Sequence, residues 1–120
     1  MATRSNIHFV QDSKIIANVY VHYDGYPENR IQELQEFFLE VKSKVNDTRF
    51  KDPSYLAAKF IVWYTQIRDT RAIVNETASL DFLGIGITNQ DAGDSDYIYT
   101  VDSSKKDFIG FPVVTYRKVW

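Results

Sequence analysis

The sequence predicts an α+β fold, in which a mostly antiparallel β-sheet carries two α-helices packed on one face, in the order ββααβββ. Apolar residues alternate through the first quarter of the chain, a pattern that is typical of paired strands. Two segments in the middle follow a helical period, and β-prone residues with hairpin-length connections return in the last third. At 120 residues, the chain has the length of one domain, spanning residues 1–120.

Two strands are predicted first, at residues 4–10 and 14–23, with a turn at residues 11–13. The two-residue period assigns one set of second-strand residues to the core, namely Ile15, Ala17, Val19, Val21 and Tyr23. The alternate residues are Ile16, Asn18, Tyr20 and His22. This second face is mixed in character, which indicates contact with a ligand or a second subunit in place of open water.

Two helices are predicted next, at residues 28–45 and 53–70, the second with Asp52 as N-cap and Pro53 in its first position. The first has one apolar stripe, formed by Ile31, Leu34, Phe37, Phe38, Val41 and Val45. The second is apolar nearly all round from residue 55 to residue 64, so it needs cover on more than one side. We therefore expect a homo-oligomer with the second helix as the interface. The alternative is burial between the sheet and the first helix.

The last third is predicted to contain a strand at residues 82–88, with Gly84 and Gly86 facing the same way, and a polar loop at residues 89–94. A strand at residues 97–101, a turn at residues 102–106 and a final strand at residues 108–120 follow.

Composition excludes several classes of function. The net charge of −2 and the sequence pI of about 5.6 argue against a general DNA or RNA binder, which needs a basic face. The absence of cysteine excludes disulfides and thiolate zinc sites, and it suits a reducing cytoplasm. The polar opening is unlike a signal peptide, and no apolar run reaches the length of a membrane span.

The junction between the second strand and the first helix, residues 20–28, is the segment most typical of a functional site. Tyr23, Asp24, Gly25 and Tyr26 combine two aromatic rings, a carboxylate and an Asp-Gly turn signal. Sites often lie on loops held by a rigid scaffold. The alternative is a structural corner whose tyrosine rings cover the core.

Catalytic and metal-binding patterns are weak in this sequence. His8 and His22 lie on predicted strands without the hydroxyl residue two positions later that a two-histidine phosphodiesterase requires, and neither has a metal-ligand partner at helical spacing. Asp91, Asp94 and Asp96 lack the closing glutamate of a calcium loop, so a solvated acidic loop is expected. No nucleophile elbow, P-loop or dinucleotide fingerprint is present. No metal or cofactor is predicted.

The sequence does hold the side chains of a nucleotide-binding site. Aromatic rings near loop ends can stack on a base, and they are Tyr23, Tyr26, Phe82 and Tyr97. Arginines can pair with phosphate oxygens, and those considered are Arg4, Arg30, Arg71 and Arg117. The side-chain amides of Asn89 and Gln90 can form hydrogen bonds with the edge of a base or with ribose hydroxyls. These features predict a binding protein without a catalyst.

Several segments together resemble a known family. They are Met1-Ala2-Thr3-Arg4-Ser5-Asn6-Ile7, Tyr20-Val21-His22-Tyr23-Asp24-Gly25-Tyr26-Pro27-Glu28, and the region from Gly84-Ile85-Gly86-Ile87-Thr88 to Tyr97-Ile98-Tyr99. The chain resembles the phage and prophage Thoeris anti-defence sponges, over nearly its whole length. The resemblance implies a protein that sequesters a cyclic ADP-ribose isomer made by a bacterial TIR-domain defence enzyme, without cleaving it, in the cytoplasm of the infected host. It also implies a homo-oligomer built from dimers, with ligands between subunits, and cyclic oligonucleotides at separate sites in related members.

The resemblance also implies residue roles. Phe82 is the first choice for stacking and Asn89 for polar recognition. Tyr23, Asp24, Gly25 and Tyr26 would shape the pocket, with Arg4 and Arg117 as phosphate partners. Two alternatives remain: a hydrolase of a nucleotide signal that uses His22 and Asp24 as an acid/base pair, and a small oligomeric phage protein that blocks a host protein by direct contact.

Overall fold

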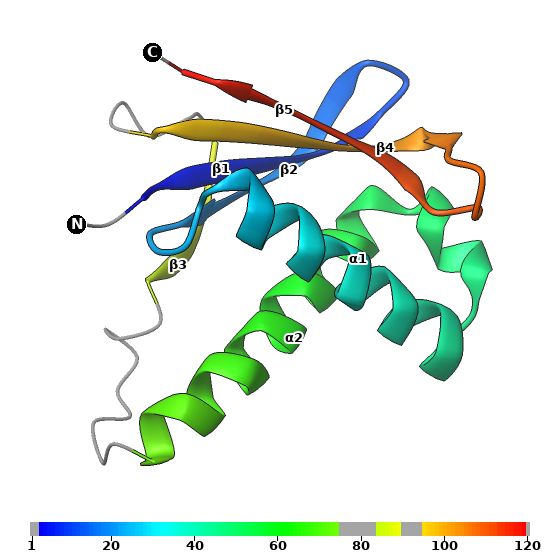
Figure 1. Cartoon of the computed structure of the whole chain (residues 1–120). Coiled ribbons are helices and arrows are strands. Elements are labelled where there is room, and N and C mark those ends of the chain that lie inside the picture. Colours follow the sequence, from blue (N-terminus) through cyan, green and yellow to red (C-terminus); the bar gives the residue numbers. More distant parts are fainter. Residues whose placement is uncertain (1–2, 75–83, 90–94, 120) are drawn as a thin grey trace.

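A computed structural model describes residues 3–74, 84–89 and 95–119 of the chain. For residue 47 and residues 67–74 it describes the backbone alone. Two helices pack on one face of a five-stranded sheet, which confirms the predicted fold class (Figure 1). The strands are β1 (Ser5–Gln11), β2 (Lys14–Val21), β3 (Ile85–Thr88), β4 (Tyr97–Lys106) and β5 (Pro112–Lys118). The helices are α1 (Pro27–Lys44), the short 3-10 helix η1 (Asp47–Lys51) and α2 (Pro53–Val74).

The strands lie in the order β3-β2-β1-β4-β5, and β1 is the central strand. Its pairing with β4 is parallel, whereas the other three pairings are antiparallel. The β1–β2 hairpin turns through Asp12 and Ser13, both with positive φ, as a two-residue hairpin of the primed type requires.

The hydrophobic core lies between the sheet and the helices. On the sheet side it contains Ile7, Phe9, Val19, Val21, Tyr99 and Val101. Phe37 of α1 and Phe60 of α2 meet there edge to face, with ring centroids 5.5 Å apart. A second aromatic group joins Phe38, Phe50 and Phe111, so that η1 and the turn before β5 close one end of the core.

The structure corrects the predicted inward position of Ile15 and Tyr23 on the second strand. Ile15 is 56% exposed because a bulge between Phe9 and Val10 shifts the register and breaks the alternation at the hairpin end. Tyr23 is exposed because β2 already ends at Val21.

The C-terminal strands also differ from the expected boundaries. β4 continues to Lys106, where a turn was predicted, and the chain reverses at residues 107–111 instead. Asp107 fixes this turn, because its Oδ1 accepts hydrogen bonds from the backbone N–H groups of Ile109, Gly110 and Phe111. The predicted residues 82 and 83 of the third strand lie outside the described part of the chain.

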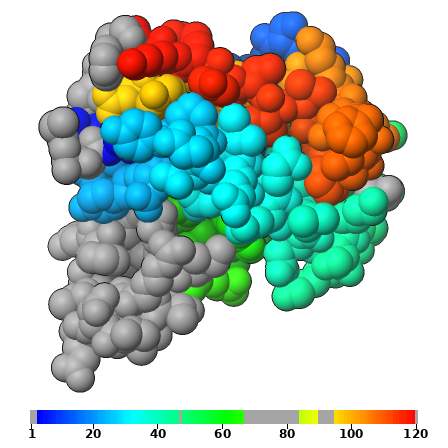
Figure 2. Space-filling view, in the orientation of Figure 1, coloured from blue at the N-terminus to red at the C-terminus, as the bar shows by residue number. Residues whose placement is uncertain are grey.

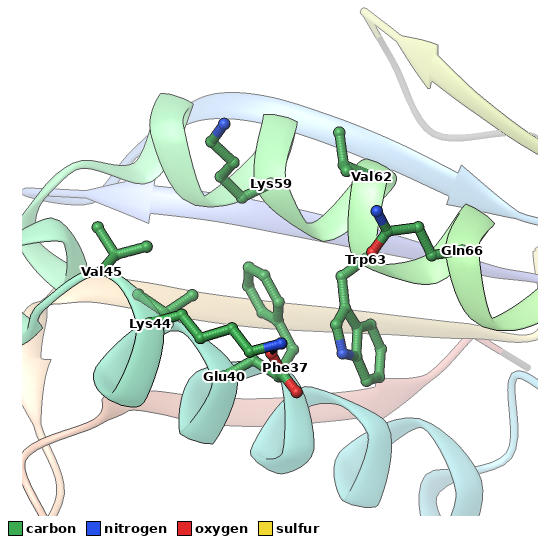
Figure 3. A pocket seen from close by; sticks show the side chains of 9 residues that line it. Phe37, Glu40, Lys44, Val45, Lys59, Val62, Trp63 and Gln66 are labelled. Atoms are coloured by element: carbon green, nitrogen blue, oxygen red, sulfur yellow. Dashed lines mark ion pairs between the residues drawn. The ribbon is translucent and has the colours of Figure 1, made fainter.

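Helix α2 is covered in part by its own chain over residues 53–66, whose side chains the structure describes. Leu56, Phe60 and Tyr64 are buried against the sheet and α1. Val62 remains 49% exposed and lines a groove between the helices with Trp63 and Val45 (Figure 3). Lys44 lies along that groove and pairs with Glu40 of the same helix at 3.0 Å. No described helix is long and apolar enough to cross a membrane.

Candidate functional site

The corner between β2 and α1, residues 22–26, is built around Gly25. Its N–H donates to the backbone oxygen of Thr3 at 3.0 Å, and its own carbonyl accepts a hydrogen bond from the buried hydroxyl of Tyr99. A Cβ at Gly25 would lie 2.7 Å from the Thr3 oxygen and 3.2 Å from the carbonyl carbon of Arg4. Only glycine therefore allows the corner to pack this closely on the segment before β1.

Arg30 of α1 fixes the corner from the helix side through a hydrogen bond to its backbone. Its side chain is fully buried, and Nη2 donates to the backbone oxygen of Tyr23 at 2.7 Å. Nη1 pairs with Glu33 at 3.2 Å, and the guanidinium lies 5.6 Å from the centroid of the Tyr64 ring. The expectation that Arg30 could serve as a phosphate partner is wrong, because the side chain is enclosed by the protein and directed at the corner.

The corner carries an exposed aromatic surface that we call the tyrosine platform, formed by Tyr26, Tyr97 and Tyr116. The Tyr26 and Tyr97 rings lie 6.1 Å apart with planes at 58°, and the Tyr97 and Tyr116 rings lie 6.3 Å apart at 60°. Tyr26 is 48% exposed and Tyr116 is 51% exposed. Tyr99 contacts the rings of Tyr97 and Tyr116 from the buried side. The corner, the start of β4 and the end of β5 lie side by side in Figure 2.

The electrostatics of the platform are set by burial and by neighbouring acids. Desolvation and then the Glu28 carboxylate raise the pKa of Tyr97 above its ordinary value of 10.0. Burial raises the pKa of Tyr99 still further, and the Arg30 cation acts in the opposite direction. Both phenols therefore stay neutral at physiological pH, and the Tyr97 ring can take part in stacking without charge.

The sequence-predicted residues fall into separate groups in the structure. Tyr26 and Tyr97 are brought together on the platform. Tyr23 lies 4.6 Å from His22, centroid to centroid, edge to face, and its ring packs against Gly84 at the start of β3. Asp24 follows with a positive φ of 58°. Phe82, the first choice for stacking, lies outside the described residues, as does Gln90.

Of the two predicted phosphate partners, Arg117 lies on the sheet face away from the helices, which we call the open face. Arg117 pairs in register with Ile98 and alternates with Tyr116, so it faces away from the platform. Arg4 precedes β1, and its backbone N–H donates to Asp96 Oδ2 at 3.0 Å. Both histidines lie on the same open face, and the Nδ1 atom of His22 is within 2.9 Å of the Tyr20 hydroxyl.

Asn89 is separated from the corner within one chain. It lines a hollow at the opposite end of β3, with Asn18, Thr88, Ile16 and Ile87 among its neighbours. Asn89 follows Gly84 by five residue steps of extended chain, a distance of about 16 Å. A single chain therefore does not bring Asn89 to the residues of the corner.

Sequence reasoning missed Tyr99 and Tyr116 as parts of the site. The signal was present in the spacing Tyr97-Ile98-Tyr99, since residues two apart share a face of a strand. Tyr116 is joined to them only through the β4–β5 register, in which it is opposite Tyr99. Among the described residues, no three side chains of the metal-ligating types His, Cys, Asp and Glu gather into a possible ion site.

Comparison with known proteins returns no match: no family model, curated protein or solved structure resembles the chain closely enough to assign it.

Proposed function

We propose that the chain is a viral anti-defence protein that binds and sequesters a cyclic ADP-ribose isomer, glycocyclic ADP-ribose, without cleaving it. The signal would be made by a TIR-domain immune enzyme in the cytoplasm of the infected bacterium. The proposal takes its ligand from the sponge resemblance of the N-terminal segments. Its support from geometry is the tyrosine platform, because the half-exposed ring of Tyr26 and the partly buried ring of Tyr97, 71 positions apart (97 − 26), meet there at the surface.

The chemistry of the platform suits a base. Stacking of a base on an aromatic side chain contributes about 1–3 kcal/mol, and rigid rings lose little entropy on binding. The corner that carries Tyr26 is held in place by the hydrogen bonds of Gly25, Tyr99 and Arg30 described above. Capture at low signal concentration needs a Kd of about 1 nM, which is a binding free energy of about −12 kcal/mol. Stacking on the platform cannot supply all of this free energy. The proposal therefore includes further contacts from Phe82, Asn89, Arg4 or Arg117.

The deciding experiment separates capture from hydrolysis. The purified protein is mixed with equimolar glycocyclic ADP-ribose, binding is measured by calorimetry, and the protein is then denatured by heat. Recovery of intact ligand with about one ligand per site supports sequestration. Linear product would instead support the hydrolase, with His22 and Asp24 as its acid/base pair. Absence of binding to this ligand and to a panel of cyclic oligonucleotides would leave the host-protein blocker as the better explanation.

Phe82 provides a second test of the same proposal. Phe82→Ala should weaken capture at least tenfold, the equivalent of about 1.4 kcal/mol, which lies within the range of about 1–3 kcal/mol for one stacking contact. Circular dichroism and mass in solution should stay at their wild-type values. An unchanged affinity would remove Phe82 from the site.

A further inference from the structure

The two edges of the sheet differ in how they are protected. Edge strands are usually blunted by charge or proline, which prevents unwanted pairing with other chains. β5 follows this rule with Pro112, Arg117 and Lys118. β3 has the sequence Ile85-Gly86-Ile87-Thr88, without charge or proline, and its Ile87 side chain is 77% exposed. Among the described residues, β3 is an edge strand with a bare outer side.

The backbone groups on that outer side can be identified. His22 donates its N–H to the Gly84 oxygen at 2.7 Å, so Gly84 directs its hydrogen-bonding groups toward β2. Because these directions alternate along a strand, Gly86 and Thr88 also face β2. The backbone N–H and C=O groups that point away from β2 are therefore those of Ile85 and Ile87, and by the same alternation those of Asn89 just after the strand.

We infer that β3 pairs antiparallel with β3 of a second copy of this chain, forming one continuous sheet across a two-fold axis. The outward backbone groups restrict the register. Each hydrogen-bonded pair must join one of the residues Ile85, Ile87 and Asn89 of one chain to one of the same three residues of the second chain. Ile87 then lies opposite Ile87 of the partner subunit, and Ile85 lies opposite Asn89 of the partner subunit. This register forms about six backbone hydrogen bonds across the axis.

The side chains are compatible with this pairing. The two Ile87 side chains become a cross-strand apolar pair, which removes the most exposed large aliphatic side chain of the described residues from water. On the other face, no atom lies within 4 Å of the position that a Cβ on Gly86 would take, so this side of the strand is unobstructed. An uncharged strand also places no like charges opposite each other at the axis.

The pairing brings the two ends of β3 together across the axis. Asn89 of the partner subunit is opposite Ile85, so its side chain lies on the face that Ile85 shares with Val21. The Tyr23 ring, 3.0 Å from the Gly84 Cβ position, lies on the other face. The pairing therefore brings Asn89 of one chain to the β3 end beside the corner of the other chain, and it does not depend on the proposed function.

The test compares the two sheet edges. The mass of the full chain is measured by light scattering and sedimentation, without ligand, from about 1 to 100 μM. We expect a dimer that Ile87→Lys converts to a monomer, because two introduced ammonium groups would lie opposite each other at the axis. Thr115→Lys on β5 is the matched control and should keep the dimer mass. Ile87 is exposed, so the substitution should leave the circular dichroism spectrum unchanged.

Cross-linking checks the register. The chain has no cysteine, so Ile87→Cys introduces a single thiol, and the Cα atoms of a bonded antiparallel pair lie about 5.5 Å apart, within reach of a disulfide. Mild oxidation should give a covalent dimer from Ile87→Cys and none from Thr115→Cys. A wild-type chain that stays monomeric, a dimer mass unaffected by Ile87→Lys, or failure of Ile87→Cys to cross-link would each overturn the inference. A cross-linked dimer that binds no nucleotide would leave the pairing intact and reject the proposed function.

Discussion

At the scale of single residues, Gly25 determines how the corner is placed. Its backbone is bonded on both sides, to Thr3 and to the Tyr99 hydroxyl, and there is no space for a side chain. The Asp-Gly turn signal predicted the corner, but the reason for glycine is the approach of residue 3, which comes from the start of the chain. A local pattern cannot reveal that approach, because it depends on tertiary packing.

Gly25→Ala should destabilise the fold by about 1–3 kcal/mol, since the new Cβ would lie 2.7 Å from a backbone oxygen that cannot move freely. Gly86→Ala is the matched control, because nothing lies near its Cβ position, and its effect should stay within about 0.5 kcal/mol. Urea unfolding of both variants at low protein concentration measures the difference. Equal stabilities would contradict the close packing at the corner.

Tyr26→Ala should weaken binding of the cyclic nucleotide about 5- to 150-fold, the equivalent of one stacking contact of about 1–3 kcal/mol. Tyr26→Phe keeps the ring and should bind nearly as well as the wild type. Calorimetric titration of the two variants decides whether the platform is used. Equal affinities in Tyr26→Ala and the wild type would place the ligand elsewhere.

At the scale of elements, helix α2 shows what a hydrophobic pattern leaves open. The sequence from Tyr55 to Tyr64 predicted a helix that needs cover on more than one side, and the structure buries Leu56, Phe60 and Tyr64 while Val62 stays exposed. It could not distinguish cover by α1 from cover by another subunit, because both bury the same apolar surface. The predicted inward position of Ile15 is wrong for a different reason: the bulge at Ile16 of β2, which displaces Ile15, leaves no recognisable local signal.

Phe60→Ala should lower the free energy of unfolding by about 3–5 kcal/mol, because Phe60 is fully buried between Phe9, Phe37 and Tyr64 and would leave a cavity. Val62→Ala, two positions later on the exposed side of α2, should cost less than about 0.5 kcal/mol. Chemical denaturation measures both values. A large effect of Val62→Ala in a concentration-dependent transition would instead reveal an interface on the helix groove.

At the scale of the whole molecule, the fold class and the order of elements were predictable because each element has its own period and its own turn residues. The arrangement of the site was not. Tyr26, Tyr97 and Tyr116 meet only because the β1–β4 and β4–β5 registers bring three distant segments together. The separation of Asn89 from the corner likewise follows from strand pairing, which no spacing in the sequence encodes.

Alkaline pH should destabilise the whole fold in a predictable direction. The pKa values of Tyr97 and Tyr99 are raised in the folded state, so the folded protein holds protons that the unfolded chain releases near pH 10. Their stabilising contribution is therefore complete below pH 10 and is lost as the pH rises above it. Tyr99→Phe should cost about 1–3 kcal/mol at pH 7, because the Gly25 carbonyl loses its donor, yet its stability should fall less between pH 9 and pH 11. Urea titrations across this range measure both effects, and an equal alkaline loss in the variant would contradict them.

The central, parallel place of β1 has a consequence for how the chain is made. The β1–β2 hairpin and both helices leave the ribosome before residue 97, so the middle strand of the sheet stays half-paired during most of synthesis. Sequence-distant contacts of this kind slow folding, since a long loop must close before they form. Nascent chains shorter than about 100 residues should accordingly be sensitive to proteases, and protection should arise late, when β4 reaches its neighbour.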